Sequence, residues 1–334
     1  MAKPHDDIAR EAMRLLDAHP DAPARTLARR LVEEVNGAIT LEQARSRIRV
    51  LIGQHGTSDR KTRKTTHPRP ARAPGQGVAM PPSRARPWAP FRYPAVGRIG
   101  ILSDAHVPFH DDQALHAAVD HLRRVGIAGL LLNGDWADFY SISHWVKNPR
   151  DRDFRGELHA VRLSLEWLRQ EFPRIPIVYK LGNHEERWTA WLYQHAVEIA
   201  DEPEMHLSGW LKTERLGIEI VEDKRIVEVG QLPVLHGHEL PKGVASPVNA
   251  ARGAYMRTKH SAIVGHQHQT SGHCEPDLYH REVFCWSTGC LCDLTPEYAR
   301  VNRWNHGFAV VESRDDGEYD VENLRIANGA VRSS

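Results

Sequence analysis

Residues 98–106 have the sequence Arg-Ile-Gly-Ile-Leu-Ser-Asp-Ala-His, in which a short apolar run leads directly into a polar cluster. The same arrangement occurs again at residues 129–138, 175–185, 232–238 and 262–268. Short, continuous apolar runs of this kind predict buried parallel strands. The chain is therefore predicted to have an α/β fold, with its polar clusters in loops at the ends of strands.

The polar clusters are rich in the residue types that bind metal ions. In chain order they are Asp104-Ala-His106, Gly134-Asp135-Trp-Ala-Asp138, Gly182-Asn183-His184-Glu185, His236-Gly-His238 and Gly265-His266-Gln-His268. In sheets that carry helices on their faces, sites form outside the carboxyl ends of the strands. Segments that are far apart in the sequence can therefore meet in one pocket.

A ligand set of Asp, Asn and several His, without a thiolate, suits hard or borderline divalent ions rather than an iron–sulfur cluster or a structural zinc. Two such ions, about 3.5–4 Å apart, need an anionic ligand between them. Asp135 is the candidate bridge. The remaining predicted ligands are Asp104, His106 and His268 for the first ion, and Asn183, His236 and His266 for the second. Manganese, iron and zinc all remain open as the native metal.

A pair of divalent ions is well suited to hydrolysis at phosphorus. The ions hold the phosphoryl oxygens and lower the pKa of a bridging water, which attacks as hydroxide. His184 is left over from the predicted ligand set, and a free imidazole beside two cations can act as general acid towards the leaving oxygen. The sequence thus predicts a hydrolase that acts on phosphoester bonds.

The ordered motifs D-x-H, G-D-x-x-D, G-N-H-E, H-G-H and G-H-x-H resemble those of the calcineurin-like metallophosphoesterases, over roughly residues 96–312. The resemblance implies an αββα sandwich of two sheets flanked by helices. It implies that His236 binds metal, with His238 as a second candidate or a substrate contact. Asp138 and Glu185 are predicted to orient the His ligands and the loops.

One position departs from the pattern of the phosphoprotein phosphatases in this superfamily. They usually carry Arg soon after G-D-x-x-D, where this chain has Phe139-Tyr140-Ser141. Arg187, in another loop, could supply the missing charge. The departure favours nucleic acid or nucleotides as substrate, and a nuclease or phosphodiesterase as activity. A phosphomonoesterase for proteins or small metabolites is the alternative. A non-catalytic nucleic-acid-binding scaffold is a third hypothesis, disfavoured because no ligand is missing.

The charge of the chain is divided unevenly. Residues 1–95 carry 18 Lys and Arg against 9 Asp and Glu, whereas residues 96–334 carry 26 against 34. Residues 1–56 are predicted to form a small, helix-turn-helix-like domain of three helices. Residues 57–95 are predicted to be a basic, Pro-rich linker that precedes the catalytic domain, residues 96–334. The last of the three helices carries Arg45, Arg47 and Arg49, which are the candidate contacts to DNA or RNA.

Three further expectations concern relatives, localisation and the cysteines. The basic arm and the segment 286–304 resemble those of phage and prophage members of the superfamily. The N-terminus lacks the apolar core of a signal peptide, and no apolar run approaches membrane-spanning length, so we expect a cytoplasmic protein without a membrane partner. For Cys274, Cys285, Cys290 and Cys292, buried reduced thiols are the favoured interpretation over a structural zinc.

Overall fold

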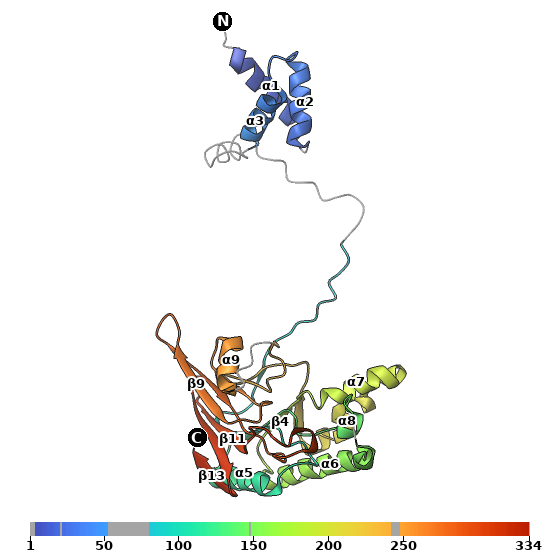
Figure 1. The fold of residues 1–334 in the computed structure, drawn as a ribbon, viewed down its shortest axis with the longest axis vertical. Helices are drawn as coiled ribbons and strands as arrows, with labels where there is room; N and C mark the ends of the chain where they lie inside the picture. Colours follow the sequence, from blue (N-terminus) through green and yellow to red (C-terminus); the bar gives the residue numbers. More distant parts are fainter. Residues whose placement is uncertain (1–3, 21, 53–79, 147, 242–247, 334) are drawn as a thin grey trace. The chain divides into compact units, whose positions relative to one another are not determined.

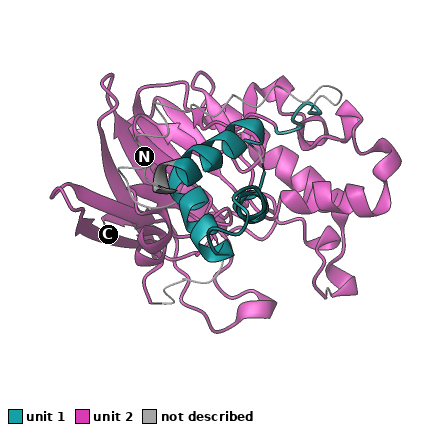
Figure 2. Cartoon of the chain, turned by 90° about the horizontal axis from the view of Figure 1, so that it is seen from above, with its two compact units in different colours: residues 1–85 teal, residues 86–334 magenta. Residues whose placement is uncertain are grey.

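The structure, a computed structural model, describes residues 4–20, 22–52, 80–146, 148–241 and 248–333. It divides into two compact units, Met1–Ala85 and Arg86–Ser334 (Figure 2). Most of the predicted linker, residues 57–79, lies outside the described residues. Among the residues that the structure does describe, none of the helices combines the length and the hydropathy that a membrane crossing requires.

The first unit contains the three predicted helices, α1 (Pro4–Ala18), α2 (Ala24–Glu34) and α3 (Leu41–Leu51). Their apolar stripes meet in a small core that includes Leu16, Leu27, Leu31 and Ile48, all fully buried. Helix α3 begins with a capping box, in which the Thr40 side chain accepts a hydrogen bond from Gln43 N and the Gln43 side chain accepts one from Thr40 N. The prediction of a small helical domain before the α/β fold is confirmed.

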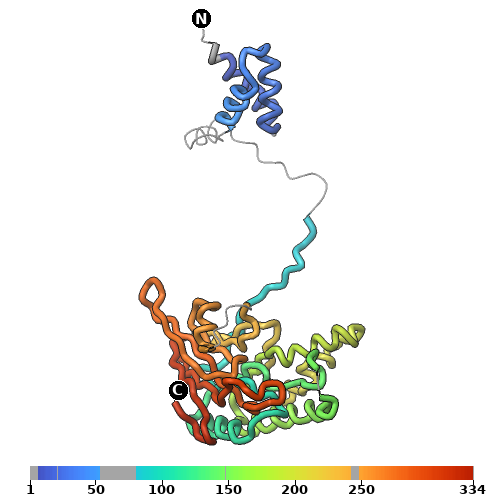
Figure 3. The backbone as a smooth tube through the Cα atoms, in the orientation of Figure 1, coloured from blue at the N-terminus to red at the C-terminus, as the bar shows by residue number. Residues whose placement is uncertain are grey.

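The second unit is built on two sheets. The seven-stranded sheet has the order β13-β12-β11-β2-β3-β4-β5. Its parallel part contains β2 (Gly97–Leu102), β3 (Gly129–Asn133), β4 (Ile177–Lys180) and β5 (Ile218–Val221). From the C-terminal part of the chain, β11 (Gly307–Ser313) returns antiparallel to β2, followed by β12 (Tyr319–Ala327) and β13 (Ala330–Ser333) (Figure 3).

The six-stranded sheet has the order β1-β6-β7-β8-β10-β9. Its strands are β1 (Phe91–Arg92), β6 (Val227–Val229), β7 (Leu232–Leu235), β8 (Ala262–Val264), β9 (Ser271–Pro276) and β10 (Glu282–Ser287). Strand β1 corrects the sequence interpretation, which places these residues in the linker. Phe91 N donates to Ile226 O at 2.7 Å and Tyr93 N donates to Glu228 O at 2.9 Å. Because Tyr93 is also buried in the core, the sandwich begins before residue 96.

The two sheets pack face to face through an apolar core, and helices cover both outer faces (Figure 1). Helices α5 (Asp112–Val125), α6 (Phe154–Glu171), α7 (Glu186–His195) and α8 (Leu207–Leu211) lie on the side of the seven-stranded sheet. Helix α9 (Ala250–Thr258) packs on β8, β9 and β10. Short 3₁₀ helices complete the unit: η1 (Tyr140–Ile142), η2 (Pro149–Asp151), η3 (Val197–Ile199), η4 (Pro203–Met205), η5 (Glu214–Leu216) and η6 (Glu297–Ala299). The predicted two-sheet sandwich is confirmed.

The five predicted strands correspond to β2, β3, β4, β7 and β8. The first three are parallel neighbours in one sheet, and the other two are parallel neighbours in the other sheet. The polar clusters therefore approach one another from both layers of the sandwich.

Candidate metal centre

The loops that follow β2, β3 and β8 have an unusual backbone at the predicted ligands. Five of these residues have a left-handed conformation: Asp104 (φ 57°), His106 (φ 50°), Asp135 (φ 51°), His266 (φ 64°) and His268 (φ 55°). Non-glycine residues in this region cost on the order of 1–3 kcal/mol each and persist where the surroundings hold them. Here Asp104 N donates to Gly134 O at 3.1 Å, and His106 N donates to Asp135 O at 2.9 Å. The two neighbouring loops thus fix each other.

Asp135 lies at the middle of the cluster. Its Oδ2 is 3.2 Å from Nε2 of His236, 3.8 Å from Nε2 of His184 and 3.9 Å from Nε2 of His106. Its other oxygen, Oδ1, accepts a hydrogen bond from His184 N at 2.9 Å. The side chain is buried, so one carboxylate oxygen faces three imidazole nitrogens away from water.

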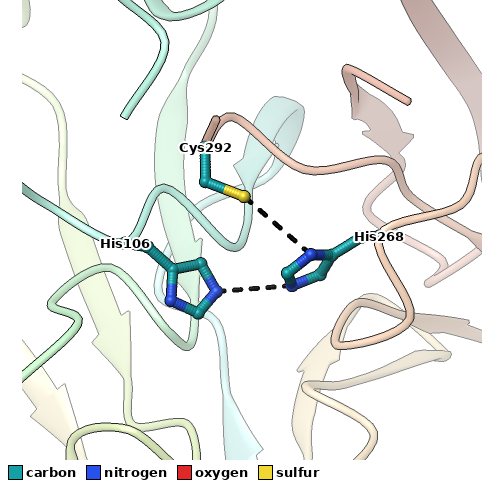
Figure 4. Close-up of side chains that lie close together, drawn as sticks. All are labelled: His106, His268 and Cys292. Atoms are coloured by element: carbon teal, nitrogen blue, oxygen red, sulfur yellow. Dashed lines mark hydrogen bonds between the residues drawn. The ribbon is translucent and has the colours of Figure 1, made fainter. Parts of the chain in front are cut away.

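One side of the cluster contains Asp104, His106 and His268. Asp104 Oδ1 is 3.1 Å from His268 Nε2. Figure 4 shows the next contact, in which the same His268 Nε2 is 3.3 Å from His106 Nε2. Asp104 Oδ2 accepts hydrogen bonds from His266 N at 3.0 Å and from the Ser103 hydroxyl.

The other side contains Asn183, His236 and His266. His236 Nε2 lies 3.3 Å from Asn183 Oδ1. One ligand atom each from Asp135, His236 and His266 lie within 4.8 Å of one another. The structure thus brings together all seven residues that the sequence proposes as ligands.

Tautomers show why this cluster suits cations. His106 donates from Nδ1 to the carboxylate of Asp138 at 2.9 Å, and His236 donates from Nδ1 to the carbonyl of Asn133 at 2.8 Å. When these two rings are neutral, the proton is on Nδ1 and the lone pair is on Nε2. Each Nε2 lone pair then points at the oxygen and nitrogen atoms around Asp135 and Asp104. This arrangement is repulsive unless a proton or a metal ion lies between, and a second-nitrogen bond to an oxygen is typical of metal-binding His.

The protonation of the cluster supports the same interpretation. Burial alone would raise the pKa of Asp104 and of Asp135, but the surrounding His rings hold both well below the usual range. Burial would lower the pKa of His236 and of His268, yet the buried carboxylates raise each to about 10. In contrast, burial and the neighbouring His236 lower the pKa of His266 to about 4. The carboxylates thus favour positive charge in this pocket. Its oxygen and nitrogen atoms therefore suit divalent cations, which would replace the protons on His236 and His268.

Asp138 and Glu185 lie directly around this cluster. Asp138 Oδ1 accepts hydrogen bonds from Nδ1 of both His106 and His184, each at 2.9 Å. Burial opposes ionisation of Asp138, but these two bonds lower its pKa. The Glu185 carboxylate accepts from the backbone N–H groups of Asp135 (3.0 Å), Ala137 (2.9 Å) and Gly182 (2.8 Å), and from the hydroxyl of Tyr179 (2.6 Å). It therefore joins the loops after β3 and β4.

His184 stands beside the proposed ligands. Its Nδ1 donates to both the side chain and the carbonyl of Asp138, each at 2.9 Å. Burial would lower the pKa of His184, but Asp135 and Asp138 raise it. Arg187 donates from Nη2 to His184 Nε2 at 2.8 Å and from Nη1 to Asp138 O at 2.9 Å. Arg187 lies in the first turn of α7 and not in a loop, which corrects the sequence interpretation. Its guanidinium lies beside Asp138, directly before Phe139, the position where the phosphoprotein phosphatases carry Arg.

His238 faces a different direction from His236. Its Nε2 is 3.0 Å from Glu186 Oε1, and its Nδ1 is 3.6 Å from Glu239 Oε2. The geometry therefore favours His236 over His238 as a ligand.

The sequence interpretation missed three residues around the cluster. Glu239 accepts from the backbone N–H groups of His236 (3.1 Å) and Gly237 (2.6 Å) and pairs with the buried Lys180 at 2.6 Å. Its place directly after H-G-H is a signal that could have found it. Cys292 Sγ lies 3.8 Å from His268 Nδ1, the nitrogen turned away from Asp104 (Figure 4). No local motif marks this thiol, which lies 24 residues along the chain from His268.

The candidate nucleic-acid contacts lie on α3 of the first unit. Arg45, Arg47 and Arg49 are half-buried, and Arg45 Nη1 is 3.5 Å from Glu42 Oε1.

No protein-family model matches the chain. Two mycobacteriophage proteins, each named Gene 54 protein, are similar in sequence. The protein of Mycobacterium phage L5 is 27% identical over 181 residues, which are 52% of this chain and 69% of that protein. The protein of Mycobacterium phage D29 is 28% identical over 252 residues, which are 70% of this chain and 94% of that protein.

Solved structures show more distant similarity. Vacuolar Protein Sorting 29 of Cryptosporidium parvum is 12% identical with a TM-score of 0.38, covering 71% of this chain and 95% of that one. A dimetal phosphatase from Danio rerio is 13% identical with a TM-score of 0.36, covering 71% and 98%. The nuclease MPE of Pseudomonas putida is 13% identical with a TM-score of 0.31, covering 71% and 87%. These values are too low to transfer a function. In its two sheets flanked by helices and in the order of its polar clusters, the chain resembles the calcineurin-like metallophosphoesterases.

Proposed function

We propose that this protein is a metal-dependent phosphoesterase that acts on nucleic acid or nucleotides. The observation that carries the proposal is the convergence on Asp135 Oδ2 of ring nitrogens from His236, His184 and His106, with Asp104 and His268 beside them. One divalent ion would be held by Asp104, His106 and His268. The other ion would be held by Asn183, His236 and His266, and Asp135 would contribute to both sites. When bound, the two ions supply Lewis acidity towards the phosphate and a hydroxide nucleophile.

His184 is the proposed general acid. Asp138 orients its ring through Nδ1, which leaves Nε2 to deliver a proton to the leaving oxygen. Arg187 donates to this Nε2, which in that state cannot carry a proton. A phosphate oxygen is a stronger acceptor for the guanidinium than a neutral ring nitrogen, so substrate would draw Arg187 away and free Nε2 for protonation.

The test uses methyl p-nitrophenyl phosphate, a generic phosphodiester, with manganese, iron(II) or zinc added in turn. Wild-type protein is expected to release p-nitrophenol, whereas Asp135→Asn and His184→Ala lose most of this turnover. Asp120→Asn is the matched control, because Asp120 is 69% exposed on α5. Inactivity of the wild type with every ion, or full activity of Asp135→Asn, would contradict the proposal.

The nucleic-acid part of the proposal rests on charge. Residues 1–95 have twice as many basic as acidic residues, which a polyanion would attract. Arg45, Arg47 and Arg49 are the proposed contacts, and DNA and RNA are both open.

A phosphomonoesterase is the second candidate, and the position of Arg187 favours it. A guanidinium beside His184 could clamp a dianionic phosphate. The ratio of kcat/KM for p-nitrophenyl phosphate and for methyl p-nitrophenyl phosphate distinguishes cleavage of nucleic acid, which requires the diester to be preferred, from hydrolysis of phosphomonoesters, mononucleotides included.

A further inference from the structure

A cavity of about 140 Å³ opens beside the candidate metal centre. Two of its lining residues, His106 and Asp138, belong to the centre itself. A larger cavity, of about 760 Å³, lies around β1, β6 and the turn after β11, and none of the seven proposed ligands lines it. The smaller cavity is therefore the space next to a phosphate held at the centre.

The remaining walls of the smaller cavity are mainly of two kinds, aromatic rings and carboxylates. The rings are Phe109, Tyr140 and Tyr298, and the carboxylates are Asp151, Asp293 and Glu297. Phe109 and Tyr140 have ring centroids 5.9 Å apart in an edge-on arrangement. Neither Lys nor Arg is among the described residues that line this cavity.

Tyr298 connects the aromatic wall to the centre. Its ring is 6.3 Å from Trp304, whose ring lies 4.3 Å from that of His268. Most of the side chain is open to solvent. Burial of the phenol group and the Asp138 carboxylate nevertheless raise the pKa of Tyr298.

The chemistry of the walls selects the ligand. Carboxylates that line a cavity without Lys or Arg in its walls repel a second phosphate, but they accept hydrogen bonds from amino groups. Aromatic rings stack on nucleobases. The volume is close to that of an enclosed cavity of about 150 Å³ that takes up one benzene ring, so it accommodates a single six-membered ring more readily than a fused pair. One six-membered ring with an exocyclic amine meets all three conditions.

We propose that this cavity is a subsite for cytosine, the base of a nucleotide whose phosphate is held at the metal centre. The inference rests on the proposed function and narrows its substrate class.

The experiment measures how strongly nucleotides inhibit the hydrolysis of methyl p-nitrophenyl phosphate. In this substrate the methyl ester, which remains on the phosphate when p-nitrophenol leaves, is too small to fill the subsite. The inhibitors are 5′-CMP, 3′-CMP, the matching uridine and adenosine monophosphates, and ribose 5-phosphate. We expect one of the two cytidine isomers to inhibit roughly tenfold more strongly than ribose 5-phosphate, since stacking on aromatic side chains favours a bound base. It should also exceed its uridine counterpart, which has a carbonyl in place of the amine, and its adenosine counterpart, which is larger.

Two variants locate the effect. Phe109→Ala should abolish the advantage of CMP over ribose 5-phosphate. Glu297→Gln should bring the CMP and UMP inhibition constants together. Tyr193→Ala is the control, because Tyr193 is an aromatic residue 61% exposed on α7 that does not line the cavity. It should retain both ratios. Both ratios of inhibition constants, CMP to ribose 5-phosphate and CMP to UMP, are measured on the same variant, so a general loss of activity does not alter them.

Turnover of the reference diester without any preference for CMP over ribose 5-phosphate would overturn the subsite and leave the proposed function intact. UMP or AMP binding as tightly as CMP would overturn the assignment to cytosine. Absence of reference turnover with every ion would overturn the proposed function, and the subsite with it.

Discussion

At the residue scale, Asp138 connects two roles in the centre. Its carboxylate orients His106, a proposed ligand, and His184, the proposed acid, through one oxygen atom. Side chains that orient a metal-binding His raise its basicity and set its tautomer. One substitution at Asp138 should therefore affect both metal binding and proton transfer.

The expected result for Asp138→Asn is a decrease of about 10- to 100-fold in kcat or in metal affinity. The amide can present its NH₂ group to Nδ1, which then becomes an acceptor and disturbs the tautomer. The measurements are kcat and the manganese concentration at half-maximal activity. Asp120→Asn should leave both unchanged, and wild-type values for Asp138→Asn would show that these hydrogen bonds have no functional weight.

Glu185 and Glu157 are both largely buried, but they should respond differently to substitution. Glu185→Ala leaves the N–H groups of Asp135, Ala137 and Gly182 without their acceptor, and we expect a loss of about 3 kcal/mol or more in unfolding free energy. Glu157 bonds Ser141 through Oε1 only, and its Oε2 has no hydrogen-bond partner among the described residues. Denaturant titration of Glu185→Ala and Glu157→Gln tests the contrast, which equal losses would contradict.

The pKa of Glu157 is raised, mainly by burial, so its protonated form is favoured in the folded state. The stability from this group is present at pH values below 4.5, its ordinary pKa, and is lost as the pH rises through the raised folded pKa. Glu157→Gln mimics the protonated form. Its unfolding free energy relative to wild type should therefore increase as the pH rises from 4.5 through the raised folded pKa, and the opposite trend would show that Glu157 is stabilised as the anion.

At the element scale, the proposed metal ligands lie in the loops that follow the strands, and the strands position these loops. The ends of β2, β3 and β4 in one sheet lie beside the ends of β7 and β8 in the other. The contacts that show this are Asn133 Nδ2 to Leu235 O at 2.8 Å, His266 N to Asp104 Oδ2 at 3.0 Å, and His236 Nε2 to Asn183 Oδ1 at 3.3 Å. Helix α3 is the element of the first unit that carries the basic residues proposed for nucleic acid.

Substitution of Arg45, Arg47 and Arg49 together by Gln should weaken DNA or RNA binding by the full chain. The slope of log Kd against log salt should fall by about one for each Arg that no longer neutralises a phosphate. The matched control is the triple replacement of Arg25, Arg29 and Arg30 by Gln, which removes the same charge from the exposed side of α2. Fluorescence anisotropy at several salt concentrations gives the slopes. Equal weakening in both triple variants would mean that α3 is not the binding element.

At the scale of the whole molecule, ion binding should contribute to folding. The centre joins both sheets, and it contains two buried carboxylates whose charge would otherwise be balanced by protons on the surrounding His rings, among them His236, His268 and His184. Ions that bind the folded state alone stabilise it by mass action.

Chelation should therefore lower the Tm, and manganese at about 100 times its Kd should restore about 2.7 kcal/mol of unfolding free energy. Calorimetry with and without manganese measures the shift independently of activity. Asp135→Asn should lose most of the shift, whereas Asp120→Asn should retain it. A wild-type Tm that does not depend on manganese would argue against a metal centre.

Local patterns in the amino-acid chain were sufficient to predict the α/β class, the five core strands and the residues of the polar clusters. A buried strand requires a continuous apolar run, and each cluster follows its strand directly, so both features are visible in a short stretch of residues. The capped third helix was predictable for the same reason. The two-residue strand β1 was not, because only its partner β6 makes it a strand.

Long-range packing, in contrast, determined which groups surround and orient the proposed ligands. Cys292 reaches His268, Asn133 orients His236, and Lys180 pairs with Glu239 only because the two sheets bring separate loops together. The cavity beside the centre is likewise assembled from the neighbouring η1 and η2 together with η6, which lies far along the chain from both. Contacts of this kind depend on packing across the sandwich, for which no short stretch of sequence carries a periodic signal.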